Sequence, residues 1–351
     1  MSETIVPFPP NALRDRLARP MHDLRISVMD RCNFRCPYCM PKETFHDGYR
    51  FLRSTERLDF AEILRLTRIA SRLGVRKLRL TGGEPLLRPN LTDLIGDLSS
   101  LPDIDDVALT TNGVLLAKYA TELRAAGLKR VTVSLDSLDP AVFRHMNGGM
   151  GEIADVLAGI DAAARAGLAP IKINTVVQQG VNDHTLLDLL GHFRGTGVIV
   201  RLIEYMDVGN RNDWRPDLVL PSAELARRIG ARWPIEPRER NYRGEVAERY
   251  QYSDGAGELG FISSISQPFC GDCARGRLSS AGEFFTCLFA TQGFDLRGPL
   301  RGGASDAELE ALWREVWSVR LDRYSELRTQ KRAAAADKTV ANKVEMFHIG
   351  G

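Results

Sequence analysis

Short runs of aliphatic and β-branched residues alternate with helical patterns over the first two thirds of the chain. Six such runs predict strands, at 24–29, 77–81, 106–111, 131–136, 171–177 and 198–205. Between the first two runs, Phe60, Ile63 and Leu64 follow helical spacing, and Gly74 is a helix stop signal. Strands that alternate with helices predict a parallel sheet with right-handed crossovers.

Six strand–helix units are too few for a closed eight-unit barrel. We therefore expect an α/β fold, an incomplete (β/α)6 TIM-type barrel over residues 21–210. In such folds the functional residues follow the carboxyl ends of the strands, where loops vary without disturbing the core. The residues that follow each predicted strand are therefore the first candidates for a site.

The pattern changes near residue 211, where a Pro-, Arg- and Gly-rich stretch begins. Residues 211–331 are expected to form a C-terminal region that covers the open side of the barrel, with short strands near 248–252 and 277–278. A capping-box pattern at Ser305 and Glu308 predicts a helix over 306–331. Residues 332–351 are expected to form a tail that ends in Gly350-Gly351, and residues 1–20 an extension without a motif.

Charge and composition exclude several classes of partner. The chain has 47 Lys+Arg against 45 Asp+Glu, a formal net charge of +2. That balance is not typical of a protein that binds nucleic acid or a membrane surface. No apolar run approaches the roughly 20 residues of a membrane span, so the expected location is the cytoplasm. Six cysteines in 351 residues are too sparse for a disulfide scaffold, which favours metal binding or catalysis.

Three of the cysteines form a tight cluster directly after the first predicted strand. Cys32, Cys36 and Cys39 have the spacing C-x3-C-x2-C. Structural zinc requires four closed ligands, and no fourth cysteine or histidine lies near in the sequence. Three thiolates instead suit a [4Fe-4S] cluster with one iron open to an external ligand, which favours iron–sulfur chemistry over zinc or a redox thiol.

The other three cysteines form a second group with the spacing C-x2-C-x13-C, at Cys270, Cys273 and Cys287. Zinc is a stronger competitor here, because C-x2-C with a distant cysteine is common in zinc ribbons. However, no histidine lies between Phe261 and Ala290 to complete four ligands. A second cubane with one open iron, able to bind substrate, needs no further ligand.

The first cysteine group resembles the signature of the radical S-adenosylmethionine (SAM) superfamily, C-x3-C-x-aromatic-C, in which Tyr38 is the aromatic residue. Gly82-Gly83-Glu84, at the end of the second predicted strand, is similar to the GGE motif of that superfamily. The resemblance implies a [4Fe-4S] cluster that binds and reductively cleaves SAM, giving a 5′-deoxyadenosyl radical. It also implies a SAM site formed by Tyr38, Gly83, Ser134 and Met206. Without it, the serine and the methionine would pass as packing residues and the glycines as turn residues.

Longer stretches are similar to the MoaA-type family of GTP 3′,8-cyclases in molybdenum cofactor biosynthesis. They are residues 24–32, 79–86, 109–113, 203–206 and 270–287 and the terminal Gly350-Gly351. The resemblance implies removal of the ribose C3′ hydrogen of GTP and closure to (8S)-3′,8-cyclo-7,8-dihydroguanosine 5′-triphosphate, with guanine held by the second cluster. The implied GTP contacts are Arg25, Arg79, Thr110, Lys172, Arg275 and Arg277. The implied catalytic residues are Arg25, Arg275, Arg277, Gly350 and Gly351.

Other interpretations of the same residues remain open at this point. Arg275 and Arg277 could be solvent-exposed side chains of an Arg-rich chain, and a Gly-Gly end is usually a frayed terminus. The whole chain could be a radical SAM enzyme that modifies a peptide, or a zinc-binding module without activity. The family resemblance implies an electron donor, a downstream cyclic pyranopterin monophosphate synthase as partner, and a monomer or homodimer.

Overall fold

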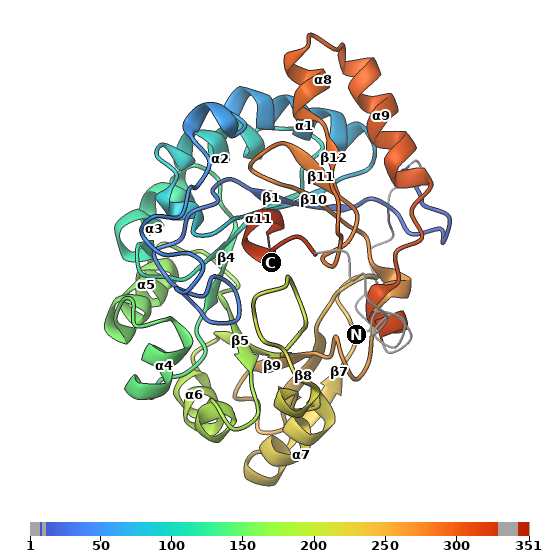
Figure 1. The fold of residues 1–351 in the computed structure, drawn as a ribbon. Coiled ribbons are helices and arrows are strands. Elements are labelled where there is room, and N and C mark those ends of the chain that lie inside the picture. Colours follow the sequence, from blue (N-terminus) through green and yellow to red (C-terminus); the bar gives the residue numbers. More distant parts are fainter. Residues whose placement is uncertain (1–7, 9–11, 329–342, 351) are drawn as a thin grey trace.

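One open sheet of 12 strands organises the molecule, and the computed structural model describes residue 8, residues 12–328 and residues 343–350. The strands are β1 (Asp23–Ser27), β2 (Lys77–Thr81), β3 (Asp106–Thr111), β4 (Arg130–Ser134), β5 (Lys172–Val177), β6 (Ile199–Glu204), β7 (Ile235–Arg238), β8 (Glu248–Tyr252), β9 (Glu258–Ile262), β10 (Arg275–Leu278), β11 (Glu283–Phe285) and β12 (Phe294–Asp295). The helices are α1 (Phe60–Arg72), α2 (Leu91–Ser99), α3 (Leu116–Ala125), α4 (Pro140–Met146), α5 (Ile153–Arg165), α6 (Leu186–Phe193), α7 (Ser222–Arg232), α8 (Arg297–Arg301), α9 (Asp306–Ser318) and α11 (Met346–Ile349). Figure 1 shows the strands curving around a central space, with most of the helices on the outer side.

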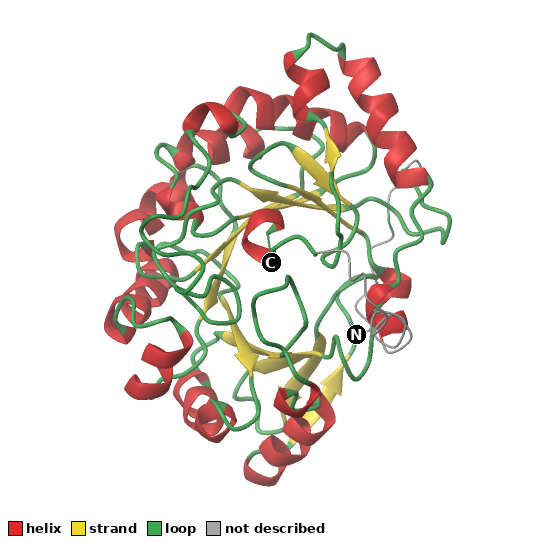
Figure 2. Cartoon of the chain, in the orientation of Figure 1, coloured by secondary structure: helices red, strands yellow, loops and turns green. Residues whose placement is uncertain are grey.

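All six predicted strands are present, and β1 to β6 pair in parallel in sequence order. The C-terminal region then adds a parallel strand at each edge, because β10 pairs with β1 and β9 pairs with β6. Antiparallel strands finish both edges, in the order β12-β11-β10 and β9-β8-β7. The incomplete, open α/β barrel expected from the sequence is confirmed. Figure 2 shows how the strands surround the centre while the helices form an outer layer.

The sequence specifies where the first outer helix begins. Asp59 is the N-cap of α1 and accepts a hydrogen bond from the Glu62 amide, while the Glu62 side chain bonds back to the Asp59 amide. Ile63, Leu66 and Ile69 lie on its buried face. Helix packing on the outer side of the sheet leaves the inner side free for polar residues.

The strands alternate between these two environments. In β1, Leu24 and Ile26 are fully buried and belong to the core between sheet and helices. Arg25 lies between them and therefore points to the opposite face, toward the centre of the barrel. Positions that alternate in this way give the central space its charged lining.

The C-terminal region differs from the sequence-based expectation in its last helix. The helix predicted over 306–331 is wrong in extent, because α9 ends at Ser318 and residues 320–323 are not helical. There, Arg320 and Asp322 bond to groups of other segments, and these tertiary contacts override the helical pattern. The predicted domain bounds 1–20, 21–210, 211–331 and 332–351 stay a prediction, since one continuous sheet crosses residue 210.

None of the helices in the described part of the chain combines the length and the apolar character that a membrane span requires.

Candidate active site with two cysteine triplets on one cavity

A single cavity of about 270 Å³ brings the two cysteine groups together. All six cysteines line it, and all six are free thiols. We call Cys32, Cys36 and Cys39 the first triplet and Cys270, Cys273 and Cys287 the second triplet. The sequence separates them by more than 230 residues, but the parallel pairing of β10 with β1 brings both to the central space. The first triplet follows the carboxyl end of β1, whereas the second lies beside its amino end.

The loop after β1 holds the first triplet through backbone hydrogen bonds. The Cys36 carbonyl accepts the amides of Cys39 (3.0 Å) and Met40 (2.8 Å), which closes a turn between two of the thiols. The Arg35 guanidinium donates to the Cys32 carbonyl at 2.7 Å and to the Phe45 carbonyl at 2.7 Å. The loop is therefore folded around an arginine that fixes where the thiols point.

Burial and acidic neighbours keep the thiols of the first triplet protonated in the metal-free protein. Burial, with Glu84 nearby, raises the pKa of Cys32 to about 12. Burial also raises the pKa of Cys36 and of Cys39. Metal binding at this triplet must therefore displace protons.

Tyr38 projects from the same loop into the cavity. Its hydroxyl donates a hydrogen bond of 2.7 Å to a carboxylate oxygen of Asp136, and burial raises the pKa of that carboxyl to about 6. Tyr38, Gly83, Ser134 and Met206 all line the cavity, so the structure brings together the four residues expected at the SAM site. Their contact with SAM stays a prediction.

The structure explains why glycines are required in the Gly82-Gly83-Glu84 motif. Gly82 has φ +147°, and a Cβ on either glycine would collide with the loop of the first triplet, at the Met29 or Arg31 carbonyl. A carboxylate in this motif would suit a ligand ammonium, but Glu84 is 1% exposed and bonds to nearby groups of the protein. It accepts hydrogen bonds from the Thr111 hydroxyl (2.8 Å) and from the Leu86 and Asn112 amides (3.0 and 2.8 Å). The glycines bring β2 and the loop together, and Glu84 fixes the turn.

Arginines surround the second triplet. Cys270 begins a 3₁₀ turn that ends at Asp272, and Cys287 follows β11. The Cys273 sulfur accepts hydrogen bonds from Arg275 and Arg320, each at 3.3 Å. Burial alone would raise the pKa of Cys273, but the two guanidinium groups lower it to about 5. Burial raises the pKa of Cys287 to about 11.

The predicted GTP contacts form a positively charged inner wall. Arg25 is in register with Arg79 on one side and with Arg277 on the other. Burial first, and then the neighbouring arginines, lower the pKa of Arg25 well below its usual value. Arg25, Arg275, Arg277 and Thr110 line the cavity, and these arginines are therefore not ordinary surface residues.

Arg79 and Lys172 lie outside the cavity wall. Arg79 is connected to the cavity wall through Thr110, because its guanidinium donates a hydrogen bond of 2.9 Å to the Thr110 hydroxyl. Burial, then Arg201 and Arg130, lower the pKa of Lys172 to about 7. A lysine in this state gains charge when an anion binds.

Arg201 is a further inward-facing cation that the sequence reasoning missed. It donates to the Asn174 side-chain oxygen at 3.0 Å, and burial lowers its pKa to about 9. Its position in β6, between apolar neighbours that face the core, could have indicated from the sequence that Arg201 faces inward. Only the register of Asn174 with Arg201 shows that it shares a face with the other cations.

The C-terminal tail enters the site. Helix α11 packs against β1, and Met346 and Phe347 line the cavity. The Gly350 carbonyl accepts a hydrogen bond from Arg277. Gly350 has φ +71°, and a Cβ there would collide with the Thr81 side chain. Gly351 lies outside the described residues.

Each donor set consists of three cysteine thiols, which are the usual ligands of an iron–sulfur cluster. Among residues 8, 12–328 and 343–350, no three His, Cys, Asp or Glu side chains lie close enough together to hold one metal ion. Zinc needs ligands that converge on one point, whereas a cubane is wider and accepts thiolates at its corners. Each triplet supplies three thiols on the wall of an open cavity, which fits a [4Fe-4S] cluster with one iron facing a ligand.

Structures of Streptococcus suis SuiB share the fold. The structure bound to the precursor peptide SuiA has a TM-score of 0.58 at 16% identity, covering 86% of this chain and 66% of that chain. The structure bound to S-adenosylmethionine has a TM-score of 0.53 at 17% identity, covering 77% and 61%. At such low identity the likeness shows the fold alone.

Sequence comparison is more specific. A profile described as "Radical SAM superfamily" matches residues 26–193, and one described as "Molybdenum Cofactor Synthesis C" matches residues 198–326. The chain is 54% identical over 339 residues to a GTP 3′,8-cyclase of Xanthomonas campestris, with 97% of each chain covered. It is 52% identical over 358 residues to a GTP 3′,8-cyclase of Acidothermus cellulolyticus, covering 97% of this chain and 99% of that one. The chain therefore belongs to the GTP 3′,8-cyclase family of radical SAM enzymes.

Proposed function

We propose that this protein converts GTP to (8S)-3′,8-cyclo-7,8-dihydroguanosine 5′-triphosphate, an early step of molybdenum cofactor biosynthesis. It uses SAM and two [4Fe-4S] clusters. The observation that carries the proposal is that both cysteine triplets and the arginine wall open on one cavity. Its relatives named GTP 3′,8-cyclase support the reaction.

The first triplet would hold the cluster that binds SAM, beside Tyr38, Gly83, Ser134 and Met206. The second triplet would hold the cluster that contacts the guanine of GTP. The chemistry that these groups supply when bound is reductive cleavage of SAM and removal of the ribose C3′ hydrogen. The remaining tasks belong to the protein: to orient GTP, compensate its charge and exclude water.

The inner wall performs the first two tasks. Arg25, Arg275 and Arg277 lie in the cavity, and their fork-shaped guanidinium groups suit phosphate and purine acceptors. Arg79 and Lys172 extend the positive charge farther along the lumen, and Thr110 adds a hydroxyl. A buried, uncompensated set of cations favours a polyanion, because the anion offsets the repulsion among them.

The tail performs the third task. Phe347 lines the cavity and packs edge-on against Phe45, with 5.0 Å between ring centroids. Gly350 binds Arg277 through its carbonyl, so the tail end and the substrate share an arginine. We assign Arg25, Arg275, Arg277, Gly350 and Gly351 as the catalytic residues.

The deciding experiment uses the full chain purified without oxygen. Iron analysis should give about eight irons per chain. With a reductant, [3′-²H]GTP should stimulate SAM cleavage and pass its deuterium into 5′-deoxyadenosine, while ATP should not. SAM cleavage that ignores GTP and responds to a peptide would contradict the proposal, as would two zinc ions per chain.

The partners follow from the same proposal. An electron donor must supply the reducing equivalent, and cyclic pyranopterin monophosphate synthase would consume the product. The protein would act in the cytoplasm as a monomer or homodimer, where six free thiols stay reduced.

A further inference from the structure

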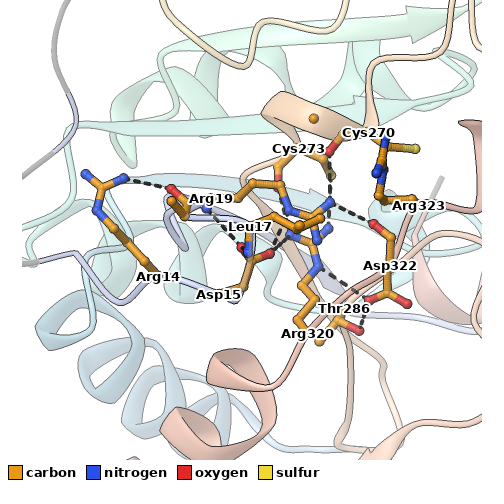
Figure 3. A network of polar contacts seen from close by, with 12 residues as sticks. Arg14, Asp15, Leu17, Arg19, Cys270, Cys273, Thr286, Arg320, Asp322 and Arg323 are labelled. Atoms are coloured by element: carbon orange, nitrogen blue, oxygen red, sulfur yellow. Dashed lines mark hydrogen bonds and ion pairs between the residues drawn. The ribbon is translucent and has the colours of Figure 1, made fainter.

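The segment from residue 12 to Pro20, which carries no sequence motif, packs behind the second triplet. Asp15 and Arg19 are buried there, although both are charged. Figure 3 shows their side chains meeting Arg320 beside Cys270 and Cys273. We call Asp15, Arg19 and Arg320 the buried charge triad.

Arg19 joins the N-terminal segment to the cysteine turn. Its Nε bonds to Asp15 Oδ2 at 2.6 Å. Its Nη1 donates to the Cys270 carbonyl at 2.8 Å and to the Asp322 carbonyl at 2.7 Å. The other Asp15 oxygen accepts the amides of Leu17 and Arg19, both at 2.9 Å. Asp15 therefore fixes both the backbone and the side chain that support the turn.

Arg320 joins the same carboxylate to a cysteine sulfur. Its Nη1 lies 3.2 Å from Asp15 Oδ2 and donates to the Cys273 carbonyl at 2.8 Å. Its Nη2 donates to Cys273 Sγ at 3.3 Å. The guanidinium stacks on the ring of Trp317, at 4.5 Å from the centroid. These contacts orient Arg320 with one N–H directed at the Cys273 sulfur.

The charges within the triad do not balance. Two guanidinium groups, with side chains 2% and 1% exposed, face one carboxylate that is 0% exposed. Asp322 approaches Arg320 at 3.4 Å but is 35% exposed, so water screens it. A buried charge without compensation is costly. The nearest group on the side of the second triplet is the Cys273 sulfur, 3.3 Å from Arg320 Nη2.

We infer that Asp15, Arg19 and Arg320 are positioning residues for the second cluster: Asp15 and Arg19 hold the Cys270–Cys273 turn and orient Arg320, which donates an N–H to the Cys273 sulfur. The inference rests on the second cluster of the proposed function. A donor and a positive charge beside a ligating sulfur stabilise the reduced cluster and so raise its reduction potential. They also favour retention of the thiolate ligand.

The test isolates the second cluster in the full chain by the substitutions C32S, C36S and C39S. In this background R320Q should shift the reduction potential to a more negative value and change the EPR spectrum of the reduced cluster. Iron release to a chelator should become roughly 10-fold to 100-fold faster. R320K keeps the positive charge but loses the branched guanidinium donors, so its reduction potential should lie between those of the parent protein and R320Q. The matched control is R314Q, because Arg314 lies on the exposed face of α9 and pairs with Glu310 at 2.9 Å.

Arg19, the basic N-terminal member of the triad, gives a second readout. R19Q touches no cysteine side chain, yet it should shift the potential in the same direction as R320Q, because it also removes a positive charge behind the turn. R14Q is the control for the segment, since Arg14 is exposed and donates only to the Ala18 carbonyl within the described residues. The first cluster, recorded with the second triplet replaced by serine, should keep its EPR spectrum in every variant, which reports an intact fold.

Two failures are distinguishable. If the C32S/C36S/C39S protein holds no iron, the second cluster is absent and both the two-cluster proposal and this inference are wrong. If it holds about four irons but R320Q leaves potential and iron release unchanged, only the inference is overturned. An equal shift in R314Q would overturn it as well.

Discussion

The two cysteine triplets have the same donors but opposite electrostatic surroundings. Acidic groups lie near each thiol of the first triplet: Glu84 near Cys32, Asp136 near Cys36 and Glu345 near Cys39. Two guanidinium groups contact the second triplet, and both bond to the sulfur of Cys273. Around one cavity, the first triplet therefore has acidic neighbours and the second has guanidinium neighbours.

This difference matches the proposed ligands. SAM carries a sulfonium and an ammonium group, so an acidic environment favours it, whereas GTP is a polyanion that arginines favour. The same polarity opposes exchange of the two ligands between the two ends. A chain with a net charge of +2 would reach such selectivity by distributing its charges around one cavity.

The strongest test of the comparison removes one triplet at a time. C32S/C36S/C39S should abolish 5′-deoxyadenosine formation, because SAM would lose its iron. C270S/C273S/C287S should retain about four irons and slow SAM cleavage, but should form no cyclised product. Iron analysis and product chromatography measure both. Equal loss of SAM cleavage in the two variants would show that the ends do not have separate roles.

Changes in the C-terminal tail test whether it is needed for the reaction between the two ends of the cavity. Deleting Gly350 and Gly351 should leave both clusters and GTP binding intact but stop cyclisation, because Arg277 loses its carbonyl partner. G350A should also impair cyclisation, since its Cβ would collide with Thr81. G230A is the control, as nothing lies within 4 Å of a Cβ at that position. Full activity after the deletion would make the Gly-Gly end a frayed terminus.

The reactivity of the thiols tests the electrostatic difference between the two triplets directly. In metal-free protein at pH 7, Cys273 (pKa about 5) is thiolate, while Cys32 (pKa about 12) is almost entirely thiol. After allowing for the weaker nucleophilicity of a low-pKa thiolate, iodoacetamide should modify Cys273 about 100-fold faster. Peptide mass spectrometry measures the rates, and unfolded protein is the control in which they should converge. Equal rates in the folded protein would refute the contrast.

The smallest predicted effect concerns the pH dependence of GTP binding. Burial, then Arg201 and Arg130, lower the pKa of Lys172 to about 7, and a bound triphosphate restores the charged form. GTP affinity should therefore be highest below pH 7 and fall roughly fivefold from pH 7 to pH 8, because binding then takes up a proton. Calorimetry without reductant measures this.

The K172M variant should bind GTP more weakly, and its GTP affinity should lose the part of the pH dependence that comes from Lys172. The pH dependence that remains reports the titration of GTP itself. K118M, at an exposed position on α3, is the matched control. An unchanged slope in K172M would remove Lys172 from the triphosphate site.

Local patterns made much of the fold predictable. The alternation of aliphatic runs with helical periods marked all six strands from β1 to β6, because buried parallel strands and amphipathic helices have different periods. The spacing of the cysteines marked both triplets. The end of α9 was missed, since the contacts of Arg320 and Asp322 are with residues distant in the sequence.

The sequence by itself determined the parallel α/β architecture, the two sets of three thiols and the glycines that let β2 approach the loop after β1. Only the tertiary structure decided that both triplets share one cavity and that Arg201 faces the other cations. It alone placed Asp15 and Arg19 behind Cys273. The reason is physical: burial and charge proximity arise between residues hundreds of positions apart, and these long-range contacts give six similar cysteines their different surroundings.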